Sequence, residues 1–560
     1  MSYEAQGAQR DVVASTAPVL VVLGGAGTGK TTTAVAAARR QLDTADEREA
    51  LRRQAAQRAG HRTRLPAPER VLFLSFSRTA VVQIIDRASG VIGPFASRLE
   101  VATFHGFAWR IINSFGPHHG YPQPQTVLSE AQRLFDESRP GLTYDELLPA
   151  AMRLLALEKV RDHYRGRYGL VICDEFQDTA DLEWQFLQQI APGARRILLG
   201  DANQCIYAGF KDIDADARIA TAMQLPGAVK IPLPPRSYRD PSGTLPAAAE
   251  AALQRDFTHP AIRTAAAADR ISVTSYDDGN GHAEVIDLVR AARKDGHTVA
   301  IFTHTHQATF SLSEALRNEG MAHELVGEAE AYGEALAAQL ALVKFALNVP
   351  NAEVLRTLAI YVQATERKGN KYRVPLASQM LDPKTNPVLQ NALQRLAHDL
   401  QAAVGEAELP DVSRLAEAVT NAYSMVGAFR DQETWLQAAR QTRSALRRLG
   451  EGGDIAAVEQ ELLRARDEAL VGAGTARRAP IQVMNLHQTK GREADTTILL
   501  LGSDEWYGSE EEPYPTGSKL LYVVMTRARN NAHLVVPDLV HGLWRPLVAA
   551  LRAVAGSPPH

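Results

Sequence analysis

The feature that most constrains this chain is the stretch from Gly24 to Thr31, which reads GGAGTGKT. It fits the phosphate-binding pattern G-x-x-x-x-G-K-[ST]. The apolar run Val19–Leu23 before it is typical of a buried parallel strand, and a helix-forming run follows to Arg40. In this context the backbone N–H groups of the loop can turn toward an anion at a helix N-terminus. The stretch predicts a nucleoside triphosphate site in an α/β domain; the alternative is a glycine-rich turn without a ligand.

Two side chains at the end of this loop complete the predicted site. Lys30 is expected to reach the β- and γ-phosphates, and the Thr31 hydroxyl is expected to hold Mg²⁺. The loop residues predicted to contact the nucleotide are Gly24, Ala26, Gly27, Thr28 and Gly29.

A pair of carboxylates follows a second buried strand. The apolar run 168–173 ends directly at Asp174 and Glu175. Beside a phosphate-binding loop, the first would hold Mg²⁺ and the second would accept a proton from the attacking water. The alternative is an acidic helix N-terminus without a catalytic role.

Hydroxyl and aromatic side chains occur at the carboxyl ends of two more predicted strands, where open α/β sheets place their ligands. Hydroxyls suit phosphate oxygens and aromatic rings suit stacked bases, a combination that holds single strands without reading their sequence. Packing in the core is an equal alternative for each of them. These residues are Ser75, Phe76, Thr103, Phe104 and His105.

Several further side chains are candidates for nucleotide or strand contacts. Gln204 follows another strand and could sense the γ-phosphate, with Tyr207 behind it as a stacking candidate. Tyr238 and Arg239, an aromatic beside an arginine, suit an adenine stack and a γ-phosphate contact. Gln9 could read an adenine edge, although a surface glutamine is the commoner explanation.

The α/β pattern occurs twice along the chain. Strand candidates at 271–276 and 298–303 begin a second α/β domain, which long helical stretches interrupt and which resumes near residue 481. We therefore predict a first domain at 1–235 with a helical insertion at about 110–165, and a second domain at 236–335 and 476–560 with a helical insertion at 336–475.

Composition restricts the class of protein. The chain has 560 residues, 45% of them hydrophobic, and a formal net charge of −3, so a nucleic-acid site must be a local groove. Its two cysteines suit a reducing compartment and do not supply a thiolate zinc site. No signal peptide or membrane-spanning run is visible, so a cytoplasmic location without membrane partners is expected.

Taken in order, eight stretches resemble the motif series of superfamily-one DNA helicases of the UvrD/Rep/PcrA type. They are GGAGTGKT, FSRTA, ATFHGFA, VICDEFQDT, LLGDANQCIY, SYR, NLHQTKGRE and LLYVVMTRAR, and they span nearly the whole chain. The resemblance implies two RecA-like motor domains, each with a helical insertion, and ATP with Mg²⁺ in the cleft between them.

The resemblance also implies roles for individual residues. Gln204, Arg239 and Arg527 would meet the γ-phosphate, with Glu175 as catalytic base. Glu493 would contact the ribose. Adenine would lie against Gln9 and Tyr238, and Thr32 stands where the family usually has an adenine-stacking arginine. The residues implied along the single strand are Phe76, Thr103, Phe104, His105, Tyr207 and His487.

The leading hypothesis is an ATP-dependent 3′–5′ single-stranded DNA translocase and helicase that acts in DNA repair, recombination or replication restart. Its substrates would be single-stranded DNA and single-strand/duplex junctions, and the 3′–5′ polarity is implied by the resemblance alone. The alternative is a DNA-sensing ATPase subunit that gates a protein partner, such as a nuclease in anti-phage defence, and unwinds weakly alone. The reduced insertions and the short segment after the last motif motivate it. A repair factor is another candidate partner. An RNA helicase is a third hypothesis.

Overall fold

The computed structural model divides into two compact units. Unit 1 comprises Met1–Phe104, Leu155–Gly327 and Thr475–His560, and unit 2 comprises His105–Leu154 and Glu328–Gly474. The structure describes residues 4–58, 68–121, 126–136, 139–205, 213–277, 279–326, 329–349, 353–365, 376–382, 384, 386–404, 411–426, 432–450, 454–471, 479–489, 492–506, 511–512 and 515–555.

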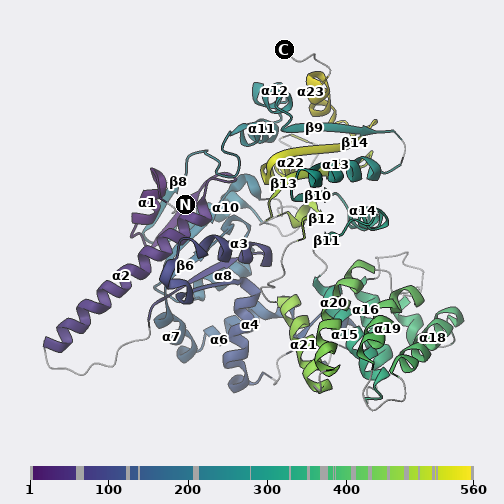
Figure 1. Cartoon of the computed structure of the whole chain (residues 1–560). Helices are drawn as coiled ribbons and strands as arrows, with labels where there is room; N and C mark the ends of the chain where they lie inside the picture. The colour runs from purple at the N-terminus through teal and green to yellow at the C-terminus, as the bar shows by residue number, and fades with distance from the viewer. Residues whose placement is uncertain are drawn as a thin grey trace. The chain divides into compact units, whose positions relative to one another are not determined.

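The first α/β domain of unit 1 is built on a parallel sheet with the strand order β3-β2-β6-β7-β1-β8. Its strands are β1 (Val19–Leu23), β2 (Arg70–Ser75), β3 (Leu99–Thr103), β6 (Tyr168–Cys173), β7 (Arg195–Gly200) and β8 (Ala228–Pro232). Its helices are α1 (Ala8–Ala14), α2 (Lys30–Arg58), α3 (Arg78–Ser89), α7 (Glu158–Arg167), α8 (Asp181–Gln189) and α10 (Ala215–Met223) (Figure 1). The short 3₁₀ turns are η1 (Gly93–Arg98), η3 (Phe176–Asp178) and η4 (Ala202–Gln204).

This strand order brings the predicted motifs to one edge of the sheet. Because all the strands are parallel, their carboxyl ends meet at the same edge. Backbone hydrogen bonds tie the strand ends together there, from Gly24 N to Gly200 O at 3.1 Å and from Asp174 N to Leu74 O at 2.9 Å. The loop after β1 and the carboxylates after β6 therefore lie within reach of each other.

The second α/β domain of unit 1 has the strand order β11-β12-β10-β13-β14-β9, again with parallel pairing throughout. Its strands are β9 (Ile271–Tyr276), β10 (Val299–Thr303), β11 (Glu324–Leu325), β12 (Ile481–Asn485), β13 (Ala494–Leu500) and β14 (Ala528–Pro537). Its helices are α11 (Thr244–Leu253), α12 (Pro260–Ala267), α13 (His282–Lys294), α14 (His306–Asn318), α22 (Pro515–Arg527) and α23 (Arg545–Ala555), and η5 (Leu486–Gln488) follows β12.

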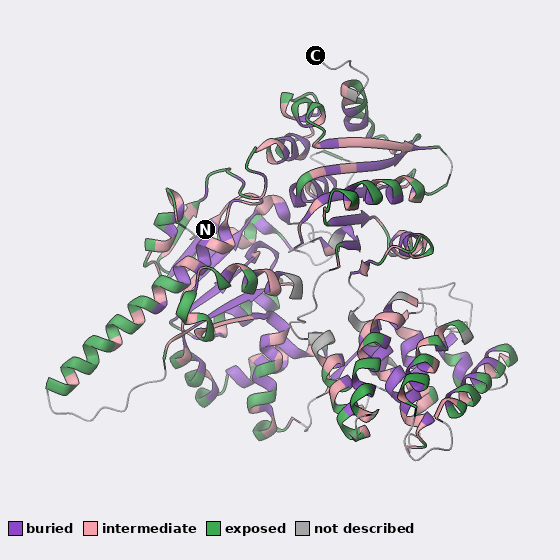
Figure 2. Ribbon diagram, viewed as in Figure 1, coloured by how far each residue is buried: buried purple, intermediate pink, exposed green. Residues whose placement is uncertain are grey.

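The central strands of each sheet are buried on both faces, as their apolar sequences require. In the second sheet, alternate residues of one strand enter different cores: Phe302 packs in one cluster and Ile301 in the other. The central strands of both sheets are accordingly buried (Figure 2). The prediction of two RecA-like α/β domains with parallel sheets is confirmed.

Unit 2 is mainly helical and contains one segment inserted after β3 and another after β11. The first segment contains η2 (Gly116–His119), β4 (Val127–Leu128), α5 (Glu130–Phe135), β5 (Leu142–Thr143) and most of α4 (Phe104–Phe115) and α6 (Tyr144–Leu155). The second contains α15 (Ala329–Ala346), α16 (Val354–Thr365), α17 (Leu376–Leu381), α18 (Pro387–Val404), α19 (Val412–Met425), α20 (Gln432–Gly450) and α21 (Ile455–Val471).

The second segment has its own apolar core around Trp435 and Tyr361, whose ring centroids lie 5.1 Å apart. Trp435 Nε1 also donates to Val419 O at 3.0 Å, which fixes α20 against α19. The predicted insertion at about 110–165 overlaps the unit 2 segment 105–154, while α7 belongs to unit 1. The remaining predicted boundaries, at 235, 335 and 475, stay predictions.

Among the described residues, no helix is both long and apolar enough to cross a membrane.

Candidate nucleotide-binding site

A cavity of about 360 Å³ lies at the carboxyl edge of the first sheet and is lined by residues of both α/β domains of unit 1. The first domain contributes the loop after β1, the carboxylates after β6, and residues of β2 and α3. The second contributes Tyr238, Arg239, Glu493, Arg527 and Arg529. Of the predicted catalytic and nucleotide-binding residues, all except Gln9 and Gly24 line this cavity.

The loop after β1 can take its shape because glycine occupies its two left-handed positions. Gly27 has φ +76° and Gly29 has φ +83°. A Cβ on Gly27 would lie 2.3 Å from Ser237 Oγ, so the loop and the segment around Tyr238 approach each other closely. Tyr238 N donates to Gly27 O at 2.7 Å and fixes this approach.

Lys30 and Gln9 both bond to the loop backbone. Lys30 Nζ donates to Gly25 O at 3.0 Å and also to Gly24 O, so Gly24 contributes through its carbonyl although it lies outside the cavity lining. Gln9 Nε2 donates to Thr28 O at 3.4 Å, and the Tyr238 hydroxyl donates to Gln9 Oε1 at 3.5 Å. Gln9 and Tyr238 thus stand side by side, as the adenine prediction requires.

Thr31 and Asp174 form an oxygen pair suited to a divalent cation. Thr31 Oγ1 donates to Asp174 Oδ2 at 3.2 Å. Burial, reinforced by the nearby Glu175 carboxylate, raises the pKa of Asp174 to about 6. A bound cation would offset both effects by stabilising the ionised form, and hydroxyl and carboxylate oxygens are the ligands that Mg²⁺ prefers. These residues fit Mg²⁺.

Glu175 has an unusual backbone. Its φ of 54° and ψ of 35° place it in the left-handed region, which is uncommon for a residue with a Cβ. Gln177 Nε2 donates to Glu175 Oε2 at 2.8 Å, while Gln177 Oε1 accepts from Asp201 N at 3.1 Å. The strained backbone at Glu175 and the hydrogen bond from Gln177 therefore aim the carboxylate into the cavity.

Gln204 and Arg527, predicted to meet the γ-phosphate, bond to each other across the cavity. Arg527 Nη2 donates to Gln204 Oε1, and Gln204 Nε2 donates to Asp201 Oδ2 at 2.6 Å. Arg527 is 4% exposed, yet its Nε has no hydrogen-bond partner in the described part of the chain. The buried Ser75 Oγ and Gln83 Nε2 in the same lining are also unsatisfied. Such orphaned polar atoms fit a site that a polar ligand completes.

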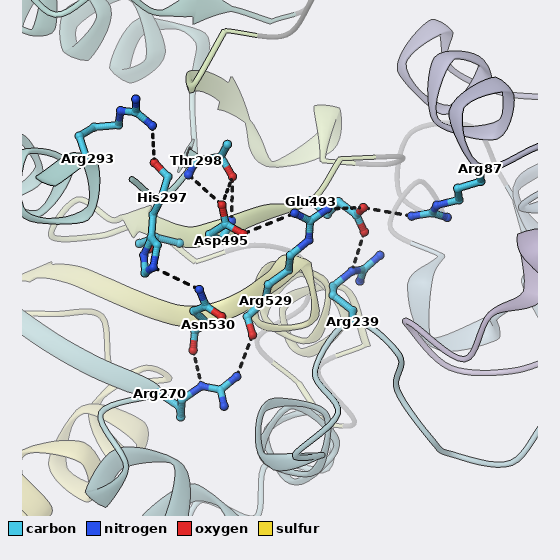
Figure 3. Close-up of polar contacts among 11 residues, drawn as sticks. Arg87, Arg239, Arg270, Arg293, His297, Thr298, Glu493, Asp495, Arg529 and Asn530 are labelled. Atoms are coloured by element: carbon cyan, nitrogen blue, oxygen red, sulfur yellow. Dashed lines mark hydrogen bonds and ion pairs between the residues drawn. The ribbon is translucent and has the colours of Figure 1, made fainter. Parts of the chain in front are cut away.

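Glu493 is held by three arginines (Figure 3). Its Oε1 accepts from Arg87 Nη2 at 3.1 Å and from Arg529 Nη2 at 2.8 Å, and its Oε2 accepts from Arg239 Nε at 2.9 Å. Burial opposes ionisation, but Arg239, Arg87 and Arg529 hold the pKa of Glu493 well below its ordinary value. Burial lowers the pKa of Arg239 to about 10, so this side chain remains cationic at neutral pH.

Arg87 and Arg529 are site residues that sequence reasoning missed. Arg529 is the final residue of the quoted stretch LLYVVMTRAR, so its position two residues after Arg527 could have suggested it. Arg87 lies within α3, eleven residues beyond Phe76, and no motif signal marks it.

The predicted single-strand residues occupy different places. Ser75 and Phe76 line the nucleotide cavity itself. Phe104 is buried and its ring centroid lies 5.1 Å from that of Phe76. Thr103 is buried at the end of β3, and His105 stacks on Tyr144 within unit 2 at a centroid distance of 3.7 Å. Tyr207 lies outside the described residues, and for His487 only the backbone, in η5, is described.

Comparisons with known proteins give partial matches. A family model described as an AAA domain matches residues 9–210. DNA helicase II of Salmonella typhimurium is 25% identical over 303 residues, covering 43% of this chain and 39% of that protein. ATP-dependent DNA helicase UvrD1 of Mycobacterium tuberculosis is 25% identical over 231 residues, or 37% and 28% of the two chains. The chain thus matches less than half the length of either relative.

RecBCD enzyme subunit RecB of Mycobacterium tuberculosis is 35% identical over 98 residues, which is 17% of this chain and 9% of that protein. The family-model match covers the phosphate-binding loop and the carboxylates after β6. Over the parts that match, the chain is similar to UvrD-like DNA helicases of superfamily one.

Proposed function

We propose that the chain is an ATP hydrolase that moves 3′ to 5′ along single-stranded DNA and separates the strands of duplexes at junctions. The observation that supports this most is the shared cavity. Its phosphate-binding loop and the carboxylates Asp174 and Glu175 come from one RecA-like domain, and Arg239, Arg527 and Arg529 come from the other. A nucleotide held there would join the two domains, and its hydrolysis would release them.

The chain's own residues divide the chemistry among them. Lys30 supplies a positive charge for the phosphates, and Thr31 with Asp174 would hold Mg²⁺, which shields the phosphate charge when bound. Glu175 orients a water molecule and takes its proton. Arg239 and Arg527 stabilise the charge that develops on the transferred phosphoryl group, and Gln204 positions Arg527.

Movement on DNA would follow from alternating closure of the two domains. Phe76 would connect the nucleotide state of the cavity to the grip on DNA, because it lines the cavity and also packs against Phe104. A shift of this aromatic pair with nucleotide state would change the grip on a single strand whose bases stack nearby. We place this activity in the cytoplasm, in DNA repair, recombination or replication restart.

Strand displacement on tailed duplexes tests this proposal. The full chain with Mg-ATP is expected to displace the strand from a 3′-tailed duplex faster than from a 5′-tailed one. Glu175→Gln, which keeps the side-chain shape without the base, is the matched control. Preference for the 5′-tailed duplex would contradict the polarity.

A second candidate is an ATPase subunit that senses DNA and gates a partner such as a nuclease. The similarity to RecB, named as a subunit of the RecBCD enzyme, favours it. DNA-stimulated ATP hydrolysis without strand displacement by the isolated chain is its expected result. Efficient displacement by the chain alone would contradict it.

A further inference from the structure

One carboxylate, that of Glu493, lies among guanidinium groups in the candidate nucleotide cavity. Arg87 reaches it from α3 of the first RecA-like domain, and Arg239 and Arg529 reach it from the second. All four side chains line the cavity that contains the phosphate-binding loop. The Glu493 and Arg239 side chains are each 12% exposed, so water screens their contact poorly, whereas Arg87 and Arg529 are 35% and 44% exposed.

The charge of the lining is unbalanced in favour of anions. Five cationic side chains, Lys30, Arg87, Arg239, Arg527 and Arg529, face three carboxylates, Asp174, Glu175 and Glu493. Asp174 lies beside Thr31 at the predicted metal site, and Glu175 is the next residue in the chain. Glu493 is therefore the anion of the described lining that neutralises the arginine side of the cavity.

Arginine recognises carboxylate and phosphate groups in the same way. Both accept charge-assisted hydrogen bonds from guanidinium N–H groups, and both favour paired donors. Arg239 Nε cannot donate fully to Glu493 and to a phosphate oxygen at once. Arg87 and Arg529 both donate to Oε1 of Glu493. When a phosphate takes Arg239 from Glu493, these two guanidinium groups can bind the phosphate as well.

We propose that Glu493 is an internal anion that occupies the arginine cluster until the phosphate chain of the nucleotide replaces it. Arg87 and Arg529 then join Arg239 as phosphate-binding residues. This inference rests on the proposed function for the identity of the ligand. Competition by Glu493 weakens nucleotide binding, and the return of its carboxylate to the arginines helps phosphate to leave after hydrolysis.

The proposal differs from the ribose contact that the family resemblance implies for Glu493. A ribose contact would make Glu493 improve the binding of ATP and have no effect on a ligand without a sugar. An internal anion makes Glu493 oppose the binding of any polyphosphate. Inorganic tripolyphosphate carries the phosphate chain without ribose or base, so it separates the two roles.

The experiment is isothermal titration calorimetry of the full chain with magnesium tripolyphosphate. Glu493→Gln keeps the side-chain shape, removes the charge and is expected to bind tripolyphosphate roughly tenfold more tightly than the wild type, the effect of one charge-assisted hydrogen bond. Glu100→Gln is the matched control. Glu100 is 11% exposed and pairs with Arg167 at 3.2 Å, but neither residue lines the cavity, so the variant should bind tripolyphosphate as the wild type does.

Unchanged or weaker binding in Glu493→Gln would overturn the proposal. Arg87→Gln gives an independent test, because it should weaken tripolyphosphate binding; unchanged binding would remove Arg87 from the phosphate set. Circular dichroism and thermal unfolding of each variant establish that it is folded. ATP hydrolysis by the wild type is measured separately, so failure of the proposed function and failure of this inference give different results.

Discussion

Arg527 is a buried arginine whose hydrogen bonds are incomplete. One end of its guanidinium group bonds to Gln204, while Nε has no partner among the described residues. A buried cation with a free donor costs folding free energy, and a site that binds an anion compensates for that cost when occupied. The arrangement is therefore better explained by ligand binding than by stability.

Replacing Arg527 by Ala should spare ATP binding, because Lys30 and the loop backbone supply the ground-state phosphate contacts. It should slow turnover on the order of 10³-fold, the effect expected of an arginine that acts on the transition state. Steady-state hydrolysis with fluorescent-nucleotide binding measures both quantities. Near-normal turnover in Arg527→Ala would refute this role.

At the scale of elements, the strand ends carry most of the site. The apolar runs before Gly24 and Asp174 predicted two parallel strands. Both strands pair in parallel with β7, and this pairing alone places their carboxyl ends at the same edge of the sheet. The arginine cluster could not be predicted in this way. Arg87 lies on α3 of the first domain and Glu493 lies directly before β13 of the second, so only the tertiary fold joins them.

The strand next to one edge of the second sheet contains a partly buried histidine whose pKa is lowered. His533 of β14 is paired with Ser272 of β9, and its Nδ1 lies 2.5 Å from Ser272 Oγ. Burial lowers the pKa of His533, partly offset by Asp269. A lowered pKa in the folded state adds stability above the unfolded pKa of about 6.5, and this stability is lost as the pH falls.

Acidification from about pH 7.5 to about pH 5.5 should therefore lower the thermal midpoint of unit 1, since protonated histidine favours the unfolded chain. His533→Asn should reduce that pH dependence. The control substitution is His398→Asn, at an exposed position on α18 of unit 2. It should leave the pH dependence of the thermal midpoint of unit 1 unchanged. Equal pH dependence in His533→Asn and the wild type would show that His533 does not titrate as described.

At the scale of the whole chain, a buried ion pair in the second inserted segment of unit 2 is hydrogen-bonded to the first inserted segment. Arg466 Nη2 donates to Glu334 Oε1 at 2.9 Å, and the two side chains are 3% and 0% exposed. The other segment completes the pair: Gln132 Oε1 accepts from Arg466 at 2.8 Å, and Val127 O accepts from it at 2.9 Å. These residues lie far apart in sequence and follow no pattern, so sequence reasoning did not suggest the contact.

Arg466→Met should destabilise unit 2 by about 3–5 kcal/mol, because it leaves the Glu334 carboxylate buried without its partner. Adding Glu334→Leu should recover much of that loss, since the fully buried carboxylate is then removed, while Asp467, which pairs with Arg466 at 3.1 Å, still loses its partner. Hydrogen exchange of α5 and α21 would locate the effect. A double variant as unstable as the single one would show that the loss comes from packing and not from the charge.

The central claim is that the cavity shared by the two RecA-like domains hydrolyses ATP in response to DNA. Its most direct test is ATP hydrolysis by the purified chain with and without single-stranded DNA, with Glu175→Gln as the blank. We expect strong stimulation by single strands in the wild type and none in the variant. Hydrolysis that is absent, or that is independent of DNA, would contradict the claim.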